Sequence, residues 1–231
     1  MRLIGFASLV VFVFALSGCS VRMQNLAGAA EEALFGNDDV ALTEAEIAEL
    51  PYAATYFETE TSGRIVAVLD RATELQRVYR TGGEEAFVTR FGRIVSSSNM
   101  PGVPLYTSGL NEDPLGCWVG RTAAESSAAT TEGNCQSSWQ RTVELGNYGS
   151  NVLRQVKVSS TFEVAAQETY RHPDGTELQA TKIIERGVFA GEDFSNEFYA
   201  VNGRVVFAKH YLSKDLGYGI LQEIKPFNGD L

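Results

Sequence analysis

The chain has 231 residues and a formal net charge of −10, with 44% hydrophobic and 21% charged residues. This composition is globular, and it excludes a collagen, a coiled-coil rod and a fully disordered chain. The acidic balance argues against nucleic acid as a partner, because phosphate binding requires a basic surface. Since the chain has only two histidines, His172 and His210, we expect no histidine-rich metal centre and predict no cofactor.

The N-terminus carries an export and lipidation signal. Arg2 precedes an apolar run over residues 3–16, which is shorter than the roughly 20 residues of a spanning helix and typical of a signal peptide. The run ends in Leu16-Ser17-Gly18-Cys19, which resembles the lipobox of bacterial lipoproteins. We therefore predict a signal peptide over residues 1–18 and lipid attachment at Cys19. The alternative is an ordinary signal peptide followed by a buried cysteine.

The residue after the lipobox indicates the final location. Ser20 stands where an aspartate would favour retention in the inner membrane. We expect the protein on the outer membrane, held by its lipid, with the body in the periplasm. Two or more acyl chains give stable anchoring, because each buried methylene contributes about 0.8 kcal/mol. Cleavage leaves 18 basic and 29 acidic residues, a net charge of −11.

Two further cysteines remain in the mature chain. The periplasm is oxidising, so Cys117 and Cys135 are expected to form a disulfide, the alternative being two free thiols. The closed loop of about 18 residues would stabilise the fold by roughly 3 kcal/mol. No Cys-x-x-Cys spacing is present, and redox catalysis is therefore not expected.

The mature chain divides into a tether over residues 19–42 and a single β-rich domain over residues 43–231. The domain begins with a short helix, because Thr43 and Glu46 form a capping box and Pro51 closes the segment.

The rest of the domain favours strands. Apolar runs and period-2 alternation predict them at residues 63–70, 75–79, 86–89, 92–95, 152–164, 178–185, 198–201, 204–212 and 219–225. Asn202-Gly203 is typical of a type I′ hairpin turn, which pairs Phe198 with Phe207. Residues 98–137 are interpreted as a loop-rich excursion. About ten strands indicate an antiparallel β-sandwich or an open barrel.

One strand has an irregular alternation. In residues 152–164 the apolar face includes Val158, Phe162 and Val164, and Ser160 is an exception to the pattern. The strand is nevertheless expected to be half-buried.

Common catalytic motifs are missing from the sequence. We find no Gly-x-Ser-x-Gly, His-Glu-x-x-His, Walker loop or Gly-x-Gly-x-x-Gly pattern. His172 belongs to a turn with Pro173, and His210 shares a strand face with Ala208, where it is expected to fill space. Asp113 is the carboxylate we would test in a glycan-hydrolysing pair, although a turn-capping role is favoured.

Two other groups of residues could contact a polymer. Trp118 and Trp139 lie near the predicted disulfide and could stack on sugar rings, while packing as core residues is the favoured alternative. Six arginines are concentrated in residues 64–93 and could contact an anionic polymer or the acidic segment before them: Arg64, Arg71, Arg77, Arg80, Arg90 and Arg93. The favoured interpretation is that they protect a sheet edge from strand addition.

Four features occur in order along the chain. They are the lipobox, Leu50-Pro51-Tyr52-Ala53, Phe87-Val88-Thr89-Arg90-Phe91-Gly92-Arg93-Ile94-Val95, and an ending that runs from Asn196-Glu197-Phe198-Tyr199 through Gly203-Arg204-Val205-Val206-Phe207 to Glu223-Ile224-Lys225-Pro226. Together they resemble the YjbF/GfcB family of outer-membrane lipoproteins over roughly residues 43–228.

The resemblance implies an accessory role in exopolysaccharide or group 4 capsule assembly, beside an outer-membrane β-barrel or another polysaccharide export protein. It supplies no catalytic residues. A non-catalytic lipoprotein is therefore the leading hypothesis. A periplasmic module that binds polysaccharide and a glycan-modifying enzyme with an unrecognised carboxylate pair remain alternatives.

Overall fold

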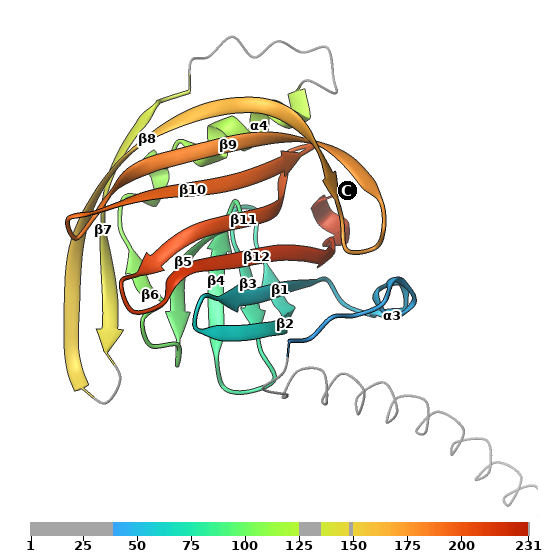
Figure 1. The fold of residues 1–231 in the computed structure, drawn as a ribbon, viewed down its shortest axis with the longest axis horizontal. Helices are drawn as coiled ribbons and strands as arrows, with labels where there is room; N and C mark the ends of the chain where they lie inside the picture. Colours follow the sequence, from blue (N-terminus) through green and yellow to red (C-terminus); the bar gives the residue numbers. More distant parts are fainter. Residues whose placement is uncertain (1–38, 125–134, 148–149, 231) are drawn as a thin grey trace, which may run out of the picture.

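The structure is a computed structural model that describes residues 39–124, 135–147 and 150–230. Its strands form one antiparallel sheet of twelve strands that curves into a nearly closed, barrel-like shape (Figure 1). The predicted signal peptide, Cys19 and residues 19–38 of the predicted tether lie outside the described residues. The division into tether and domain stays a prediction.

The first half of the sheet contains six strands. They are β1 (Ala54–Thr59), β2 (Ser62–Ala72), β3 (Arg77–Arg80), β4 (Ala86–Arg90), β5 (Arg93–Ser98) and β6 (Pro104–Thr107). The second half contains the longer strands β7 (Ser138–Asn147), β8 (Ser150–Arg171), β9 (Glu177–Phe189), β10 (Glu192–Val201), β11 (Arg204–Ser213) and β12 (Gly217–Lys225). The prediction of a mainly β, antiparallel fold is confirmed, with twelve strands where about ten were expected.

The strand order explains the curvature. The sheet runs β5-β4-β3-β2-β1-β12-β11-β10-β9-β8-β7-β6, so β12 returns to pair with β1. The edge strands β5 and β6 approach each other, and Ser97 on β5 donates a hydrogen bond to the carbonyl of Val103 just before β6. This near-closure leaves little exposed edge for pairing with other chains.

The main core lies on the concave side of the sheet, beneath helix α4 (Leu115–Ala124). The core residues come from nearly every strand and from the helix, and include Phe57, Phe87, Leu115, Val119, Trp139, Ile183, Phe198, Leu212 and Leu221. Helix α4 packs against β9, β10 and β11. The helix and both halves of the sheet therefore share one hydrophobic core.

Helix α3 (Glu44–Glu49) covers the opposite face of β1, β2 and β12. The predicted capping box is present, because Oγ1 of Thr43 accepts a hydrogen bond from the amide of Glu46 and the Glu46 carboxylate accepts one from the amide of Thr43. Ile47 packs with Tyr56 and Ile224. Nζ of Lys225 donates to the carbonyls of Ala48 and Leu50, which provides a cation where the helix dipole is negative.

The segment over residues 98–137 is more ordered than predicted. It contains β6, a 3₁₀ turn η1 (Leu110–Glu112) and helix α4. Asp113 caps α4 and Pro114 stands at its first turn, which is the favoured place for proline. The expectation of a loop-rich excursion is therefore wrong for residues 104–124. Asp113 and Pro114 start helix α4 and do not form an isolated turn.

The hairpin between β10 and β11 has the predicted turn but a different register. Asn202 and Gly203 both have positive φ, 50° and 84°, as a type I′ turn requires. A bulge between Tyr199 and Ala200 shifts the pairing by one residue, so Phe207 lies opposite Tyr199 and not opposite Phe198. A bulge inserts one unpaired residue, and the sequence gives no signal for it here.

Strand β8 has a more regular inward face than predicted. Val156, Val158, Ser160 and Phe162 are all buried, so Ser160 continues the alternation. Val164 is 43% exposed, and its expected place on the buried face is wrong. The irregular register between Val164 and Gln167 marks the point where β8 leaves the core.

Candidate functional site

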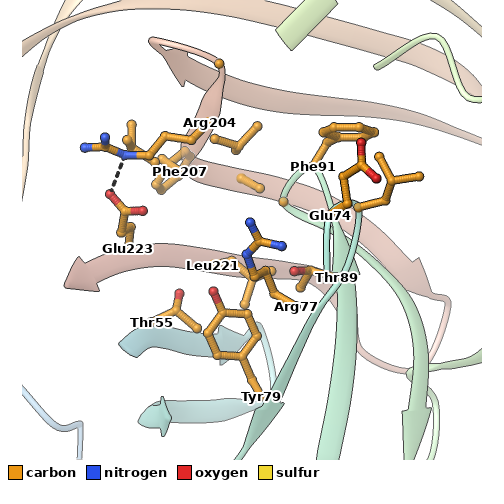
Figure 2. Close-up of a pocket in the computed structure, with 16 residues that line it drawn as sticks. Thr55, Glu74, Arg77, Tyr79, Thr89, Phe91, Arg204, Phe207, Leu221 and Glu223 are labelled. Atoms are coloured by element: carbon orange, nitrogen blue, oxygen red, sulfur yellow. Dashed lines mark hydrogen bonds and ion pairs between the residues drawn. The ribbon is translucent and has the colours of Figure 1, made fainter. Parts of the chain in front are cut away.

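A hollow of about 160 Å³ opens at one end of the concave face, between strands from distant parts of the chain (Figure 2). We call it the rim pocket. Its lining residues lie on β1, β3, β4, β11 and β12, on the loop before β3, and on the β4–β5 and β10–β11 turns: Thr55, Glu74, Leu75, Arg77, Tyr79, Thr89, Phe91, Gly92, Gly203, Arg204, Val205, Val206, Phe207, Ala208, Leu221 and Glu223. The return of β12 to β1 brings these strands together.

The floor of the rim pocket combines apolar surface with hydroxyl groups. Ala208 and Leu221 belong to the main core and provide the apolar part. Thr89 is only 4% exposed and lines the pocket. Figure 2 shows the Thr89 side chain within the pocket, beside Arg77. Oγ1 of Thr55 lies 2.9 Å from the carbonyl of Gln222 and 3.0 Å from the carbonyl of Tyr56, so its single proton is already donated within the protein.

One side of the rim is an ion pair on β11 and β12. Nε of Arg204 lies 3.1 Å from Oε1 of Glu223, and both side chains are less than one-fifth exposed. Nε2 of His172 lies 3.7 Å from the same oxygen, and Nδ1 of His172 lies 2.9 Å from Oδ1 of Asp174. His172 thus lies in the predicted turn, between Asp174 and the Glu223 carboxylate of the rim.

The other side of the rim comes from β3 and the loop before it. Nη1 of Arg77 donates to the carbonyls of Thr73 and Gln76, and its guanidinium lies 5.3 Å from the centre of the Phe227 ring. Tyr79 stacks on the buried Phe87 with ring centres 5.4 Å apart. These contacts fix the positions of Arg77 and Tyr79 at the pocket mouth.

The rim pocket has the chemistry of a binding site for a small polar group. Pockets of this kind combine an apolar surface with a few convergent polar groups that orient the ligand. Here the apolar floor, the two threonine hydroxyls and the charged rim meet within one hollow. We did not predict this site, because its parts lie on five strands and no local motif links them.

A second polar cluster lies fully inside the sheet. Nη1 of Arg93 lies 2.7 Å from Oε2 of Glu185, and Nη1 of Arg141 lies 2.8 Å from Oε1 of the same carboxylate. Nε of Arg93 also lies 3.1 Å from Oδ2 of Asp113. Asn196 donates to Glu185, and Ser160 accepts from Arg141. Two cations and two anions therefore balance in the interior.

Neighbouring aromatic rings support this charge cluster. The Arg141 guanidinium lies 4.2 Å from the Trp139 ring centre, and the Arg93 guanidinium lies 5.0 Å from the centres of Trp139 and Phe198. Cations are attracted to aromatic faces, most strongly when both are shielded from water. The cluster therefore joins β5, β7, β9 and β10 across the interior.

The cluster shifts the pKa values of its members. Burial would raise the pKa of Glu185, but the charges of Arg93 and Arg141 outweigh it and lower the pKa to about 2. Burial, aided by the charge of Arg93, lowers the pKa of His210 to about 3. His210 is therefore neutral at neutral pH, 2% exposed, and on the same strand face as Ala208, as predicted.

The sequence contains a signal for this cluster that we missed. On β9 the buried face carries Thr181, Ile183, Glu185 and Phe189. A glutamate on such a face is uncommon unless it is paired. It indicates buried cations elsewhere in the chain, although it does not identify them.

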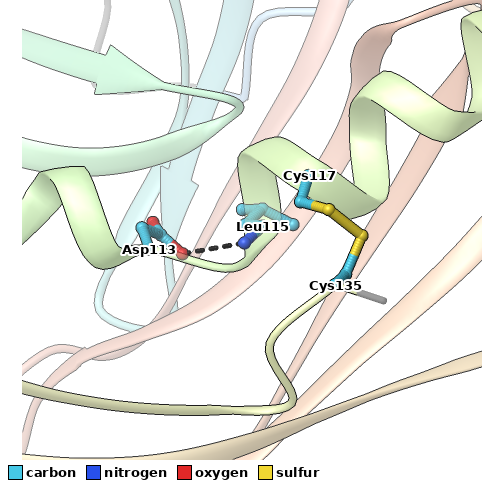
Figure 3. The surroundings of a disulfide bond; sticks show 4 residues. All are labelled: Asp113, Leu115, Cys117 and Cys135. Carbon is cyan, nitrogen blue, oxygen red and sulfur yellow. Dashed lines mark hydrogen bonds between the residues drawn. A yellow bond between two sulfur atoms is a disulfide. The ribbon is translucent and has the colours of Figure 1, made fainter. Parts of the chain in front are cut away.

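The region around Asp113 is structural (Figure 3). Oδ1 of Asp113 accepts from the amide of Leu115, while Oδ2 binds Arg93. The favoured capping role is confirmed. Cys117 and Cys135 form a disulfide with a Cα–Cα distance of 5.7 Å, which joins α4 to the segment before β7.

The two tryptophans differ in burial. Trp139 is 2% exposed and its indole nitrogen donates to the carbonyl of Gly109. Its ring packs among core residues and two arginines, which agrees with the favoured alternative of a core residue. Trp118 is half-buried, packs on the main core and lies 5.1 Å from the guanidinium of Arg121.

The arginines of residues 64–93 do not share one sheet edge. Arg64 pairs with Glu58 and Arg80 with Asp70, on strands that lie inside the sheet. Arg93 begins the edge strand β5 but points into the core. The edge-protection interpretation is therefore wrong. Acidic residues that precede Arg64 do contact it: Oδ1 of Asp39 accepts a hydrogen bond from its amide, and Glu58 pairs with its guanidinium.

The predicted lipidation site, Leu16-Ser17-Gly18-Cys19, lies outside the described residues. Within the part that the structure describes, no helix is both long and apolar enough to cross a membrane. The same residues contain no group of three or more histidine, cysteine or acidic side chains arranged to hold a metal ion.

The fold resembles a solved lipoprotein structure. The crystal structure of the hypothetical lipoprotein YmcC from Escherichia coli K12 matches with a TM-score of 0.65 and 21% sequence identity. The match covers 80% of this chain and 90% of the other. At this identity the likeness shows a shared fold.

Sequence comparisons also identify lipoproteins as relatives of this chain. The chain is 26% identical over 161 residues to the lipoprotein GfcB of Escherichia coli K12, covering 70% of this chain and 69% of GfcB. It is 23% identical over 210 residues to the lipoprotein YjbF of the same organism, covering 90% and 92%. The model of the family described as group 4 capsule polysaccharide lipoprotein gfcB, YjbF matches residues 28–221. The chain therefore belongs to the YjbF/GfcB lipoprotein family.

Proposed function

We propose that this protein is a non-catalytic accessory factor in the export or assembly of a capsule or exopolysaccharide. It acts as a lipoprotein on the periplasmic face of the outer membrane, through contact with other export components. The observation that carries this proposal is the family match over residues 28–221, whose description names a group 4 capsule polysaccharide. The lipobox at the N-terminus supports the anchor.

The carboxylate and histidine candidates support a non-catalytic role. Both carboxylate oxygens of Asp113 are engaged, one by the cap of α4 and one by Arg93. His172 and His210 are 4% and 2% exposed. A general acid or base must reach the substrate within hydrogen-bond distance, and buried, engaged groups are poorly placed for that.

Incubation of the purified protein with the polysaccharide of its own cell tests the absence of catalysis. We expect the size distribution and composition of the polymer to stay unchanged over many equivalents of substrate. The D113N variant should behave like the native protein. Cleavage or modification with turnover by the native protein would contradict the proposal.

Affinity purification of the lipidated protein from native outer membranes tests the contact with export components. Mass spectrometry of the bound proteins should recover a polysaccharide export protein or an outer-membrane β-barrel at stoichiometric level. A matched preparation from a strain that carries the untagged protein gives the background. Recovery of polysaccharide alone would favour a glycan-binding module instead.

A further inference from the structure

We propose that the rim pocket binds one neutral sugar residue of a polysaccharide. The inference rests on the proposed function, because the class of polymer comes from the family. It extends that function by naming the ligand of the pocket. The pocket is lined by charged, hydroxyl and apolar groups from five strands, and Thr89, which is 4% exposed, places a hydroxyl-bearing side chain among them.

The size of the pocket fits one ring. Its volume is about 160 Å³, and a cavity of roughly 150 Å³ accommodates a single six-membered ring. A run of several sugar residues would need a longer groove. The pocket therefore holds one ring at most, which limits a sugar ligand to a single pyranose residue at an end or a branch of a polymer.

The charges at the rim favour a neutral ligand. Arg77 and Arg204 provide two positive charges, and Glu74 and Glu223 provide two negative charges. The Arg204–Glu223 ion pair already balances itself at 3.1 Å. An acidic sugar would meet two carboxylates and find no net positive field, whereas hydroxyl groups can donate to glutamate oxygens and accept from guanidinium groups.

The floor of the pocket matches the two kinds of surface on a sugar ring. A pyranose has hydroxyl groups around its edge and C–H groups on its faces. Thr89 and Thr55 offer oxygens that can exchange hydrogen bonds with hydroxyl groups, while Leu221 and Ala208 offer apolar contact. Thr89 is 4% exposed, so a hydrogen bond between its hydroxyl and a ligand in the pocket would be largely shielded from bulk water.

Two variants test the pocket while leaving the Arg204–Glu223 ion pair intact. T89V keeps the shape of the threonine and removes its hydroxyl. L75W adds a large ring at the pocket mouth, where Leu75 is 43% exposed. V164W is the matched control, because Val164 is also 43% exposed but lies on β8 outside the lining. Circular dichroism and thermal unfolding verify that each variant is folded.

The binding measurement uses the full lipidated protein in detergent micelles. The probes are oligosaccharides from partial hydrolysis of the cell's own surface polysaccharide, separated into neutral and acidic fractions, and binding is followed by titration calorimetry. We expect saturable binding of the neutral fraction, weakened about tenfold by T89V, as for one lost hydrogen bond. L75W should weaken it by at least tenfold, and V164W should leave it unchanged.

Several results would overturn the inference. These are no saturable binding by the native protein, binding of the acidic fraction only, or equal binding by the native, T89V and L75W proteins. The proposed function is judged separately, from surface polymer in a deletion strain. If deletion removes the polymer and L75W restores it fully, the pocket inference fails and the function stands. If deletion leaves the polymer unchanged, the function fails regardless of the binding result.

Discussion

Arg93 and Glu185 form an ion pair of 2.7 Å in the interior of the protein, although 92 positions separate them in the sequence. Glu185 is fully buried and Arg93 is 3% exposed. The same carboxylate holds Arg141 at 2.8 Å, so one glutamate connects the edge strand β5 to β7 and β9. This pairing lets charged groups occupy the interior of the sheet beside the apolar core residues.

Loss of the Glu185 charge should destabilise the fold. In E185Q the two guanidinium groups of Arg93 and Arg141 stay buried with only Asp113 to balance them. Removal of one partner of a buried ion pair typically costs about 3 to 5 kcal/mol. Urea denaturation should show this loss, and E163Q is the control, since Glu163 pairs with Arg186 on the surface, where such pairs contribute about 0 to 1 kcal/mol. Equal effects of the two variants would contradict a structural role for the cluster.

His210 should make stability depend on pH below neutrality. Its pKa is about 3 in the folded protein against 6.5 ordinarily, so between these values the unfolded chain binds more protons. The free energy of unfolding therefore falls as the pH drops below 6.5, by about 2 kcal/mol between pH 7 and pH 4.5 for this one group. Urea titrations at the two pH values should show a smaller fall in H210Q. An undiminished fall in H210Q would contradict the assignment.

Reduction of the Cys117–Cys135 disulfide should destabilise the protein. The bond closes a loop of 18 residues, and the chain-entropy model gives about 3 kcal/mol for a loop of this length. Thermal unfolding with and without a reducing agent measures the effect. The C117S/C135S double variant should unfold like the reduced native protein and be insensitive to reductant. A native protein that unfolds identically in both conditions would exclude a stabilising role.

Cys19 should determine the membrane association of the protein. We expect C19A to appear in the soluble periplasmic fraction and to incorporate no labelled palmitate, because two or more acyl chains are needed for stable anchoring. Fractionation and metabolic labelling give the measurement. The C117S/C135S variant, which keeps Cys19, should remain in the membrane and incorporate label. Retention of C19A in the membrane would contradict the lipobox interpretation.

Features with local causes were predictable from the sequence. The Asn202-Gly203 turn follows from two positive φ angles that few other residue pairs adopt. The start of helix α3 follows from the reciprocal bonds of Thr43 and Glu46. The disulfide required only two cysteines and an oxidising compartment. In each case the residues that determine the structure are close in sequence or chemically unique.

Features that depend on distant contacts were not predictable in the same way. The inward orientation of Arg93 depends on Glu185 on β9 and Asp113 before α4. The rim pocket depends on the return of β12 to β1, which brings Glu223 and Arg204 opposite Arg77 and Thr89. Periodicity shows which side of a strand is buried, but it does not show which strands meet across the interior.

The most direct test of the proposed role is the amount of polysaccharide on the surface of cells that lack this protein. We predict that deletion strongly reduces the surface polymer, that the native gene restores it, and that C19A restores little because the protein no longer reaches its membrane. D113N should restore the polymer to the extent that it is folded. Unchanged surface polymer in the deletion strain would contradict a role in polysaccharide export or assembly.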